Sequence, residues 1–259
     1  ARTLALVGES GCGKTTAGKA LMQLIRPTGG SVRLDGEEQV HRRGAALRPL
    51  RRQVQMVFQD PFASLNPRMR VGDIIAEGMS ALGIKQTPAE RRDYIDTLLQ
   101  RVGLSPQMRE RFPHAFSGGQ RQRISIARAL VSEPKFVVAD ESVAALDVSI
   151  QADVLNLLKE IQQEMGLTFL FISHDLSVVA HICDHVAVMY FGRLVETAPT
   201  RELFNNPCHP YTKALLSAIP SLDPDAKNLA QKLEGEIPSP TNPPPGCKFQ
   251  TRCPHAIDI

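Results

Sequence analysis

The stretch Gly8–Thr15 reads GESGCGKT and decides how the chain folds. It fits the pattern G-x-x-x-x-G-K-[ST], in which glycines let the backbone wrap around a phosphate and backbone N–H groups face its oxygens. Lys14 of this pattern reaches the β- and γ-phosphates, and Thr15 offers its hydroxyl to Mg²⁺. A short buried strand (3–8) precedes the loop, and apolar residues at helical spacing follow it over 14–25. This order of strand, glycine loop and helix predicts a nucleotide-binding site.

Apolar runs typical of buried strands alternate with helical patterns along the rest of the chain. The strand-like runs are VQMVFQ (54–59), KFVVAD (135–140), LTFLFIS (167–173), HVAVMY (185–190) and RLVET (193–197). One long helical stretch, broken by prolines, fills 61–133. We therefore predict an α/β fold with a largely parallel sheet covered on both faces and an inserted helical subdomain.

Polar residues stand at the ends of several of these strands. Asp140 can hold Mg²⁺, directly or through water, and the adjacent Glu141 can orient or deprotonate an attacking water. Gln59 can touch the metal or the water, and His174 can donate a hydrogen bond to the γ-phosphate. Each of these residues on its own fits an ordinary structural role. Because the carboxyl ends of parallel strands meet at one sheet edge, we expect all four to converge on the glycine loop.

A second phosphate-binding feature is present in HAFSGGQRQRISIARAL, residues 114–130. Its small residues form a turn that opens a helix, and a helix N-terminus presents free N–H groups and the positive end of the helix dipole. One domain needs only one such phosphate cradle. The sequence therefore raises the question of whose phosphate the segment Ser117–Gln120 binds.

Composition excludes some classes of protein. The 259 residues carry a net charge of +3, which is too small to indicate nucleic-acid binding. No apolar stretch is long enough to span a membrane, and no signal-peptide pattern opens the chain, so we expect a protein that is soluble in itself. The five cysteines do not suggest a disulfide framework. Cys12, Cys183 and Cys208 are isolated, whereas Cys247 and Cys253 form a pair.

Taken in order, six motifs resemble those of the ATP-binding-cassette (ABC) ATPases. They are GESGCGKT, FQDP with Gln59, FSGGQ, FVVADE, AALD ending in Asp147, and SHD with His174, over residues 3–198. The resemblance implies a P-loop ATPase that hydrolyses MgATP and packs head to tail with a second cassette. In such a dimer each SGGQ loop caps the γ-phosphate of the partner's ATP, which answers the question of the second cradle.

The resemblance also assigns residues and domains. For ATP binding it implies Gly8, Glu9, Ser10, Gly11, Cys12, Gly13, Lys14, Thr15, Thr16, Ser117, Gly118, Gly119 and Gln120. For Mg²⁺ it implies Thr15, Gln59 and Asp140, and for catalysis Lys14, Gln59, Glu141 and His174. The implied domains are a P-loop ATPase core (1–60 and 134–200), a helical signature subdomain (61–133) and a C-terminal extension (201–259).

Other segments are similar to the ATPase subunits of dipeptide and oligopeptide importers. These segments are FQDPFASLNPRM, DVSIQADVLNLL, NPCHPYTKALLSAIPSL and the closing GCKFQTRCPHA. This resemblance implies a second, different cassette, two membrane permeases whose coupling helix meets the helical subdomain, and an external solute-binding protein. It implies a place on the cytoplasmic face of the inner membrane and no nucleic-acid partner.

The cysteine-rich tail of that subfamily is associated with a [4Fe–4S] cluster held by four cysteines. Cys247 and Cys253 supply two thiolates, which cannot complete such a site. We therefore expect no intact cluster in this chain and leave open one in a longer parent protein. A zinc site or a merely structural pair is the alternative.

Several departures from the family pattern are visible. The chain begins seven residues before Gly8, without the preceding strands and the adenine-stacking aromatic residue, so we expect both ends to be truncated. Ser142 stands where proline is usual, and Ala144 where serine is usual. Two rival functions stay open at this point. One is a soluble ABC ATPase acting on nucleic acid or ribosomes, and the other is a regulatory cassette that binds ATP without hydrolysing it.

Overall fold

The computed structural model describes residues 1–84, 87–219 and 243–257, and the chain divides into two compact units. The first unit comprises residues 1–2 and 16–170, and the second comprises residues 3–15 and 171–259. The functional division of the chain at residues 61, 134 and 201 stays a prediction. In the described residues no helix is long and apolar enough to cross a membrane.

The second unit contains the strand that leads into the glycine loop. Strand β1 (Thr3–Val7) runs parallel to β7 (His185–Tyr190), with Leu4 opposite His185 and Val7 opposite Val188. Strand β8 (Arg193–Pro199) pairs antiparallel with β7. The helical elements of this unit are α8 (Leu176–Ile182), α9 (Thr200–Asn205), α10 (Pro210–Ser217) and the short 3₁₀ helix η4 (Gln250–Arg252).

The first unit holds the other parallel pair. Strand β4 (Val54–Val57) runs parallel to β5 (Phe136–Asp140), and β6 (Thr168–Ser173) follows β5 in the strand order. The division between the two units falls within β6, after Leu170. The remaining elements of this part are α1 (Lys14–Leu21), β2 (Arg33–Leu34), β3 (Glu37–Glu38), η1 (Gly44–Leu47), α2 (Arg48–Gln53) and α7 (Val148–Met165). Strands β4 and β5 are mostly buried, as their apolar sequences predict.

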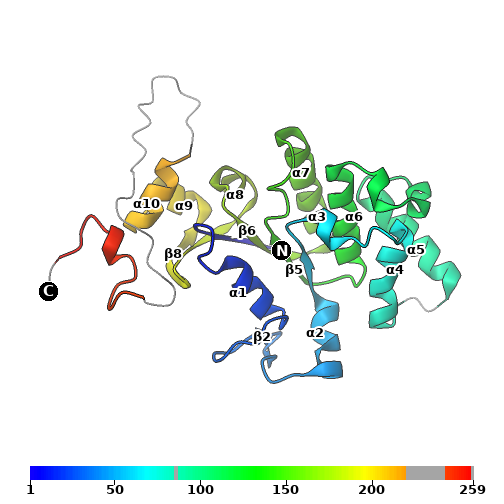
Figure 1. Cartoon of the computed structure of the whole chain (residues 1–259), viewed down its shortest axis with the longest axis horizontal. Coiled ribbons are helices and arrows are strands. Elements are labelled where there is room, and N and C mark those ends of the chain that lie inside the picture. Colours follow the sequence, from blue (N-terminus) through cyan, green and yellow to red (C-terminus); the bar gives the residue numbers. More distant parts are fainter. Residues whose placement is uncertain (85–86, 220–242, 258–259) are drawn as a thin grey trace. The chain divides into compact units, whose positions relative to one another are not determined.

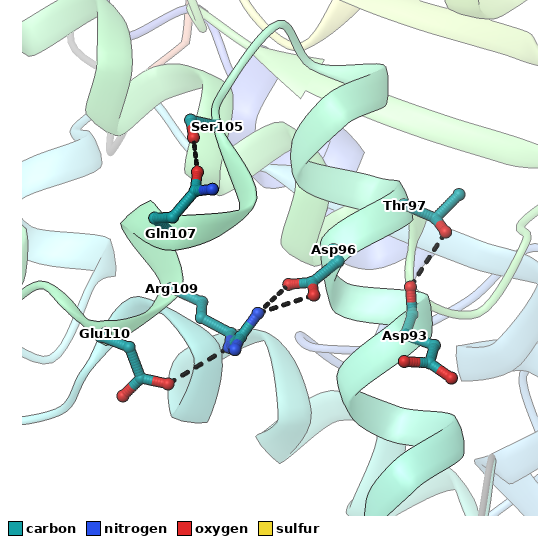
Figure 2. A network of polar contacts seen from close by, with 7 residues as sticks. All are labelled: Asp93, Asp96, Thr97, Ser105, Gln107, Arg109 and Glu110. Atoms are coloured by element: carbon teal, nitrogen blue, oxygen red, sulfur yellow. Dashed lines mark hydrogen bonds and ion pairs between the residues drawn. The ribbon is translucent and has the colours of Figure 1, made fainter.

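The described residues between 61 and 133 contain only helices and loops. The helices are α3 (Pro61–Ser64), α4 (Val71–Leu82), α5 (Pro88–Arg101), η2 (Pro106–Glu110), η3 (Pro113–Ala115) and α6 (Gly118–Leu130). Helices α4, α5 and α6 lie together in Figure 1. Figure 2 shows how η2 is tied to α5: Arg109 Nη1 lies 2.6 Å from both carboxylate oxygens of Asp96. Arg109 Nε also donates to Glu110 at 3.2 Å, so one guanidinium fixes the turn against the helix.

The structure confirms the predicted α/β class with a largely parallel sheet. Some boundaries differ from the prediction. The helix predicted over 14–25 ends at Leu21 because Gln23 adopts a left-handed backbone, with φ of 55°. The strand predicted over 54–59 ends at Val57, which leaves Gln59 in a loop. The segment Ile237–Gly246 contains five prolines, a composition typical of an extended, proline-stiffened stretch, and most of it lies outside the described residues.

Candidate nucleotide-binding site

The glycine loop follows β1, and its glycines adopt positive φ angles that residues with a side chain rarely adopt. Gly8 has φ of 152°, and a Cβ there would lie 2.1 Å from the Met189 carbonyl oxygen. Gly13 has φ of 107°, which is also unfavourable for residues with a side chain. Gly192 N donates to the Cys12 carbonyl at 2.9 Å and holds the loop against the turn after β7. The backbone of the loop therefore packs closely against Met189 and Gly192 and has the curvature of a phosphate cradle.

Lys14 starts α1 and folds back over this cradle. It is 5% exposed, and its Nζ donates to the carbonyls of Gly8 at 2.8 Å and Glu9 at 3.0 Å. Burial raises the pKa of the neighbouring Cys12 thiol, which agrees with its interpretation as a small loop residue. A left-handed glycine cradle, a buried lysine and a helix N-terminus together fit a bound phosphate.

Alanine at Gly8 is expected to destabilise the chain by about 2–4 kcal/mol, since its Cβ would overlap the Met189 carbonyl and its φ would be strained. Gly11→Ala is the matched control, because φ is also positive, at 81°, yet nothing lies within 4 Å of the added Cβ. That control should cost only about 1 kcal/mol. Urea unfolding measures the free energy of unfolding of both variants. An equal loss of stability in the two would contradict a loop whose shape depends on the close approach of Gly8 to the Met189 carbonyl.

The first unit brings two of the predicted catalytic residues together. Gln59 Nε2 donates to Glu141 Oε2 at 2.7 Å, although 82 residues separate them. Glu141 has φ of 45°, an unusual conformation for a residue with a side chain and one that recurs at functional sites. Asp140 ends β5 and is 3% exposed.

The donor set also fits a magnesium ion carried by a nucleotide. The described residues contain no group of three or more His, Cys, Asp or Glu side chains that could hold a metal. Protein sites for MgATP usually supply one or two carboxylates, and phosphate oxygens and water complete most of the coordination. Asp140, a single buried carboxylate at the end of β5, is compatible with that arrangement.

The SGGQ segment caps its own helix. Ser117 Oγ accepts from Gln120 N at 3.3 Å, and Gln120 Oε1 accepts from Ser117 N at 3.1 Å, which forms a capping box at the start of α6. A Cβ at Gly119 would lie 2.4 Å from Ile150 Cγ2, so this position must stay glycine. The capping box uses the N–H groups of Ser117 and Gln120, and Gly118 and Gly119 lie between these residues in the first turn of α6, where N–H groups have no acceptor within the helix.

His174 and the two predicted cysteines lie in the second unit. His174 is exposed and directly follows β6, and Asp175 after it caps α8 by accepting from Ser177 N at 2.9 Å. Cys247 is exposed and Cys253 is half-buried. Among the described residues no third metal ligand joins this pair, so the residues present do not fit a four-cysteine cluster.

Two further residues contact the glycine loop and were not predicted as site residues. Glu9 N donates to Tyr211 Oη at 2.8 Å, and Arg252 Nη1 lies 2.9 and 3.1 Å from the Glu9 carboxylate oxygens. Burial alone would lower the pKa of Arg252, but its interactions with Glu9 and Tyr190 together outweigh that effect and raise the pKa. The only sequence signal for these residues is that each lies in a segment of subfamily resemblance, NPCHPYTKALLSAIPSL and GCKFQTRCPHA.

Comparison with known proteins defines the class to which this fold and site belong. The family model described as ABC transporter matches residues 1–144, and the chain belongs to the ABC transporter family as one of its ATPases. Solved structures agree. CbiO1 from Clostridium perfringens, part of the ABC transporter complex cbiONQ, superposes with a TM-score of 0.70 at 30% identity, covering 79% of this chain and 80% of its own. A dimeric ATP-binding cassette bound to ADP and Pi in a post-hydrolysis state gives a TM-score of 0.69 at 26% identity, covering 77% and 86%.

Within this family the chain is similar to the ATP-binding proteins of peptide transporters. A second family model, described as the oligopeptide/dipeptide transporter C-terminal region, matches residues 195–259. A putative peptide import ATP-binding protein of Brucella ovis is 57% identical over 98% of this chain and 80% of its own length. The oligopeptide transport ATP-binding protein OppF of Salmonella typhimurium is 53% identical over 98% of this chain and 77% of its own length. The suspected family is thereby confirmed, and neither rival function is favoured.

Proposed function

We propose that the chain is the ATP-hydrolysing subunit of an importer for dipeptides, oligopeptides or related small solutes. The observation that carries the proposal is the match of residues 195–259 to the oligopeptide/dipeptide transporter C-terminal region. Relatives named for peptide import support it over nearly the whole chain. Such a subunit works on the cytoplasmic face of the inner membrane, attached to it through permease subunits.

We assign the following roles toward MgATP. Lys14 and the N–H groups of the glycine loop bind the β- and γ-phosphates, while Thr15, Gln59 and Asp140 are the side chains that hold Mg²⁺. The ion supplies positive charge that neutralises the phosphate oxygens. Glu141 accepts a proton from the attacking water, and the Gln59 amide, 2.7 Å away, orients that carboxylate. His174 donates a hydrogen bond to the γ-phosphate as charge develops on it.

The signature loop acts on a second nucleotide, the one bound by a partner cassette. Its support is the helix N-terminus at Gly118, which favours a phosphate, and the capping box in which Ser117 and Gln120 hold each other in place. We propose a heterodimer with a different cassette, two permeases, and an extracytoplasmic solute-binding protein that delivers the solute. No nucleic acid is among the proposed partners.

The permease contact is proposed on the helical elements that follow Gln59. Phe62 on α3 is 62% exposed, an unusual exposure for a large aromatic side chain. The Arg121 guanidinium lies over its ring, 3.9 Å from the centroid, and holds it in place. An exposed aromatic residue three positions after Gln59 would transmit movement of the coupling helix to the catalytic side chains.

Cys247 and Cys253 are proposed as half of a thiolate ligand set, which holds no [4Fe–4S] cluster by itself. Their spacing and the subfamily resemblance support this role. A cluster would need two more cysteines from a longer parent protein.

Reconstitution with the permeases tests the proposal. We expect peptide with its binding protein to stimulate ATP hydrolysis in proteoliposomes, and Ser117→Arg to lower that hydrolysis about 100-fold. ATP binding by this chain's own glycine loop should persist in Ser117→Arg, because the signature loop serves the partner's nucleotide. Gln163→Arg adds the same charge at an exposed site on α7 and is the matched control. Hydrolysis that ignores peptide, with co-purification of nucleic acid or ribosomes, would favour the soluble rival instead.

A further inference from the structure

The C-terminal extension holds the glycine loop at one residue, Glu9, through two independent contacts. Arg252 of η4 binds the Glu9 carboxylate with one nitrogen, at 2.9 and 3.1 Å from its two oxygens. The Tyr211 hydroxyl oxygen of α10 accepts a hydrogen bond from the Glu9 backbone N–H at 2.8 Å. Both side chains are well shielded: Arg252 is 9% exposed at its side chain, and Tyr211 is fully buried. The shielded, charge-assisted contact of Arg252 constrains the loop more than a surface ion pair would, and the Tyr211 contact adds a hydrogen bond between neutral groups.

Aromatic packing fixes the two contacting residues. Tyr211 packs edge-on against Tyr190, with ring centroids 4.7 Å apart, and Phe249 packs edge-on against the same Tyr190 ring at 5.1 Å. Phe249 is 1% exposed and lies three residues before Arg252. The turn that carries Arg252 is thus anchored by a buried ring, and Arg252 reaches Glu9 from a rigid base.

Glu9 in turn governs the position of Lys14. The carbonyls of Gly8 and Glu9 are the hydrogen-bond acceptors of Lys14 Nζ, at 2.8 and 3.0 Å. Any shift of Glu9 therefore moves the peptide units that place the lysine. Glu9 also carries a negative charge within the loop, which would repel the phosphates of ATP unless a cation such as Arg252 neutralises it.

We propose that Arg252 and Tyr211 are positioning residues for ATP binding, which act through Glu9 on the glycine loop and its lysine. The proposal rests on the proposed role of that loop in binding MgATP. It gives the C-terminal extension a task within the nucleotide site: part of the loop's shape and charge balance comes from residues more than 200 positions later in the chain.

Titration calorimetry of the intact protein with MgATP tests this inference. Arg252→Ala is expected to raise the Kd for MgATP about tenfold at unchanged stoichiometry, the loss typical of one hydrogen bond to a charged group. Arg252→Lys should recover most of the affinity because it keeps the charge. Tyr211→Phe keeps the ring and loses only the acceptor for the Glu9 N–H, so a rise of about threefold is expected.

A double-mutant cycle separates charge balance from simple structural support. In the Arg252→Ala background, Glu9→Gln removes the uncompensated charge and should recover a large part of the affinity, whereas two independent losses would add. The matched controls are Arg101→Ala, which breaks a 2.9 Å ion pair with Glu164, and Tyr94→Phe, which breaks a 3.1 Å hydrogen bond to Glu133. Neither control should change the Kd for MgATP.

The outcomes distinguish this inference from the proposed function. A Kd for Arg252→Ala and Tyr211→Phe within about twofold of wild type would overturn the inference, as would a drop in stoichiometry alone with no change in Kd. If Arg252→Ala does not fold, Arg252→Lys and Tyr211→Phe decide by the same criterion. Failure of the wild-type protein to bind MgATP at all would instead contradict the proposed role of the glycine loop.

Discussion

Replacing Glu141 with glutamine is expected to lower the rate of ATP hydrolysis about 10³-fold while leaving MgATP bound, within the range typical of a lost general base. The substitution is nearly isosteric, and the new amide can still contact the Gln59 amide that now lies 2.7 Å from the carboxylate. What disappears is the group that accepts a proton from water. The left-handed backbone of Glu141, with φ of 45°, supports this role because strain of this kind is kept where a side chain must be aimed.

The assembled transporter is the right material for that measurement, since an isolated cassette lacks the partner's signature loop. Steady-state phosphate release should fall in Glu141→Gln, and titration with MgATP should give a Kd close to that of wild type. Glu160→Gln is the matched control, because Glu160 is exposed on α7 and has no role in the site. Unchanged turnover in Glu141→Gln would contradict the assigned role, and lost binding would point to a structural one.

The sequence predicted the parts of this site that depend on local backbone chemistry. Glycines at fixed spacing before a helix specify the cradle, so Gly8, Gly13 and Lys14 could be named without a structure. The buried strands were equally clear, since continuous apolar runs have few alternatives in a parallel sheet. Ends of elements were predicted less well. Helix α1 ends at Leu21, four residues before the predicted Ile25, because Gln23 adopts a left-handed backbone conformation. No feature of the sequence pattern predicts that conformation.

Contacts between distant segments could not be predicted. Glu9 and Tyr211 are separated by 202 residues, and Glu9 and Arg252 by 243, so neither periodicity nor spacing relates them. Tyr211 has the pattern of an ordinary helix residue, and Arg252 that of a charge between two cysteines. Their contacts with Glu9 depend on the packing of Tyr211 and Phe249 against Tyr190, which brings both segments to the glycine loop.

The signature segment shows a subtler difference between pattern and structure. The sequence predicts a helix N-terminus with free N–H groups, and the structure has that terminus at Gly118. It also shows that Ser117 and Gln120 satisfy each other, at 3.1 and 3.3 Å. These contacts restrict the conformations of the loop, which lowers the entropic cost of docking against a partner's phosphate.

Lys14→Ala is expected to weaken MgATP binding roughly 10- to 100-fold, the loss typical of one charge-assisted hydrogen bond, and to abolish hydrolysis at cellular ATP concentrations. Two losses combine in this variant. The cation that meets the phosphates is gone, and the Gly8 and Glu9 carbonyls lose the donor that now lies at 2.8 and 3.0 Å. Glu9 would keep its contacts with Arg252, Tyr211 and the Cys12 N–H but lose the one with Lys14, so the loop should loosen as well as lose charge.

Titration with MgATP measures this effect, with Lys159→Ala as the matched control because Lys159 is an exposed lysine on α7. Lys14→Arg keeps the charge but places a larger, planar group in a 5% exposed site, so it should recover little. Wild-type affinity in Lys14→Ala would contradict the assignment of the glycine loop as the phosphate site. The contrast with Glu141→Gln is the decisive comparison, since one variant should lose binding and the other only the chemical step. If both variants lost binding alike, the two residues would share a structural role and the division between phosphate cradle and general base would be wrong.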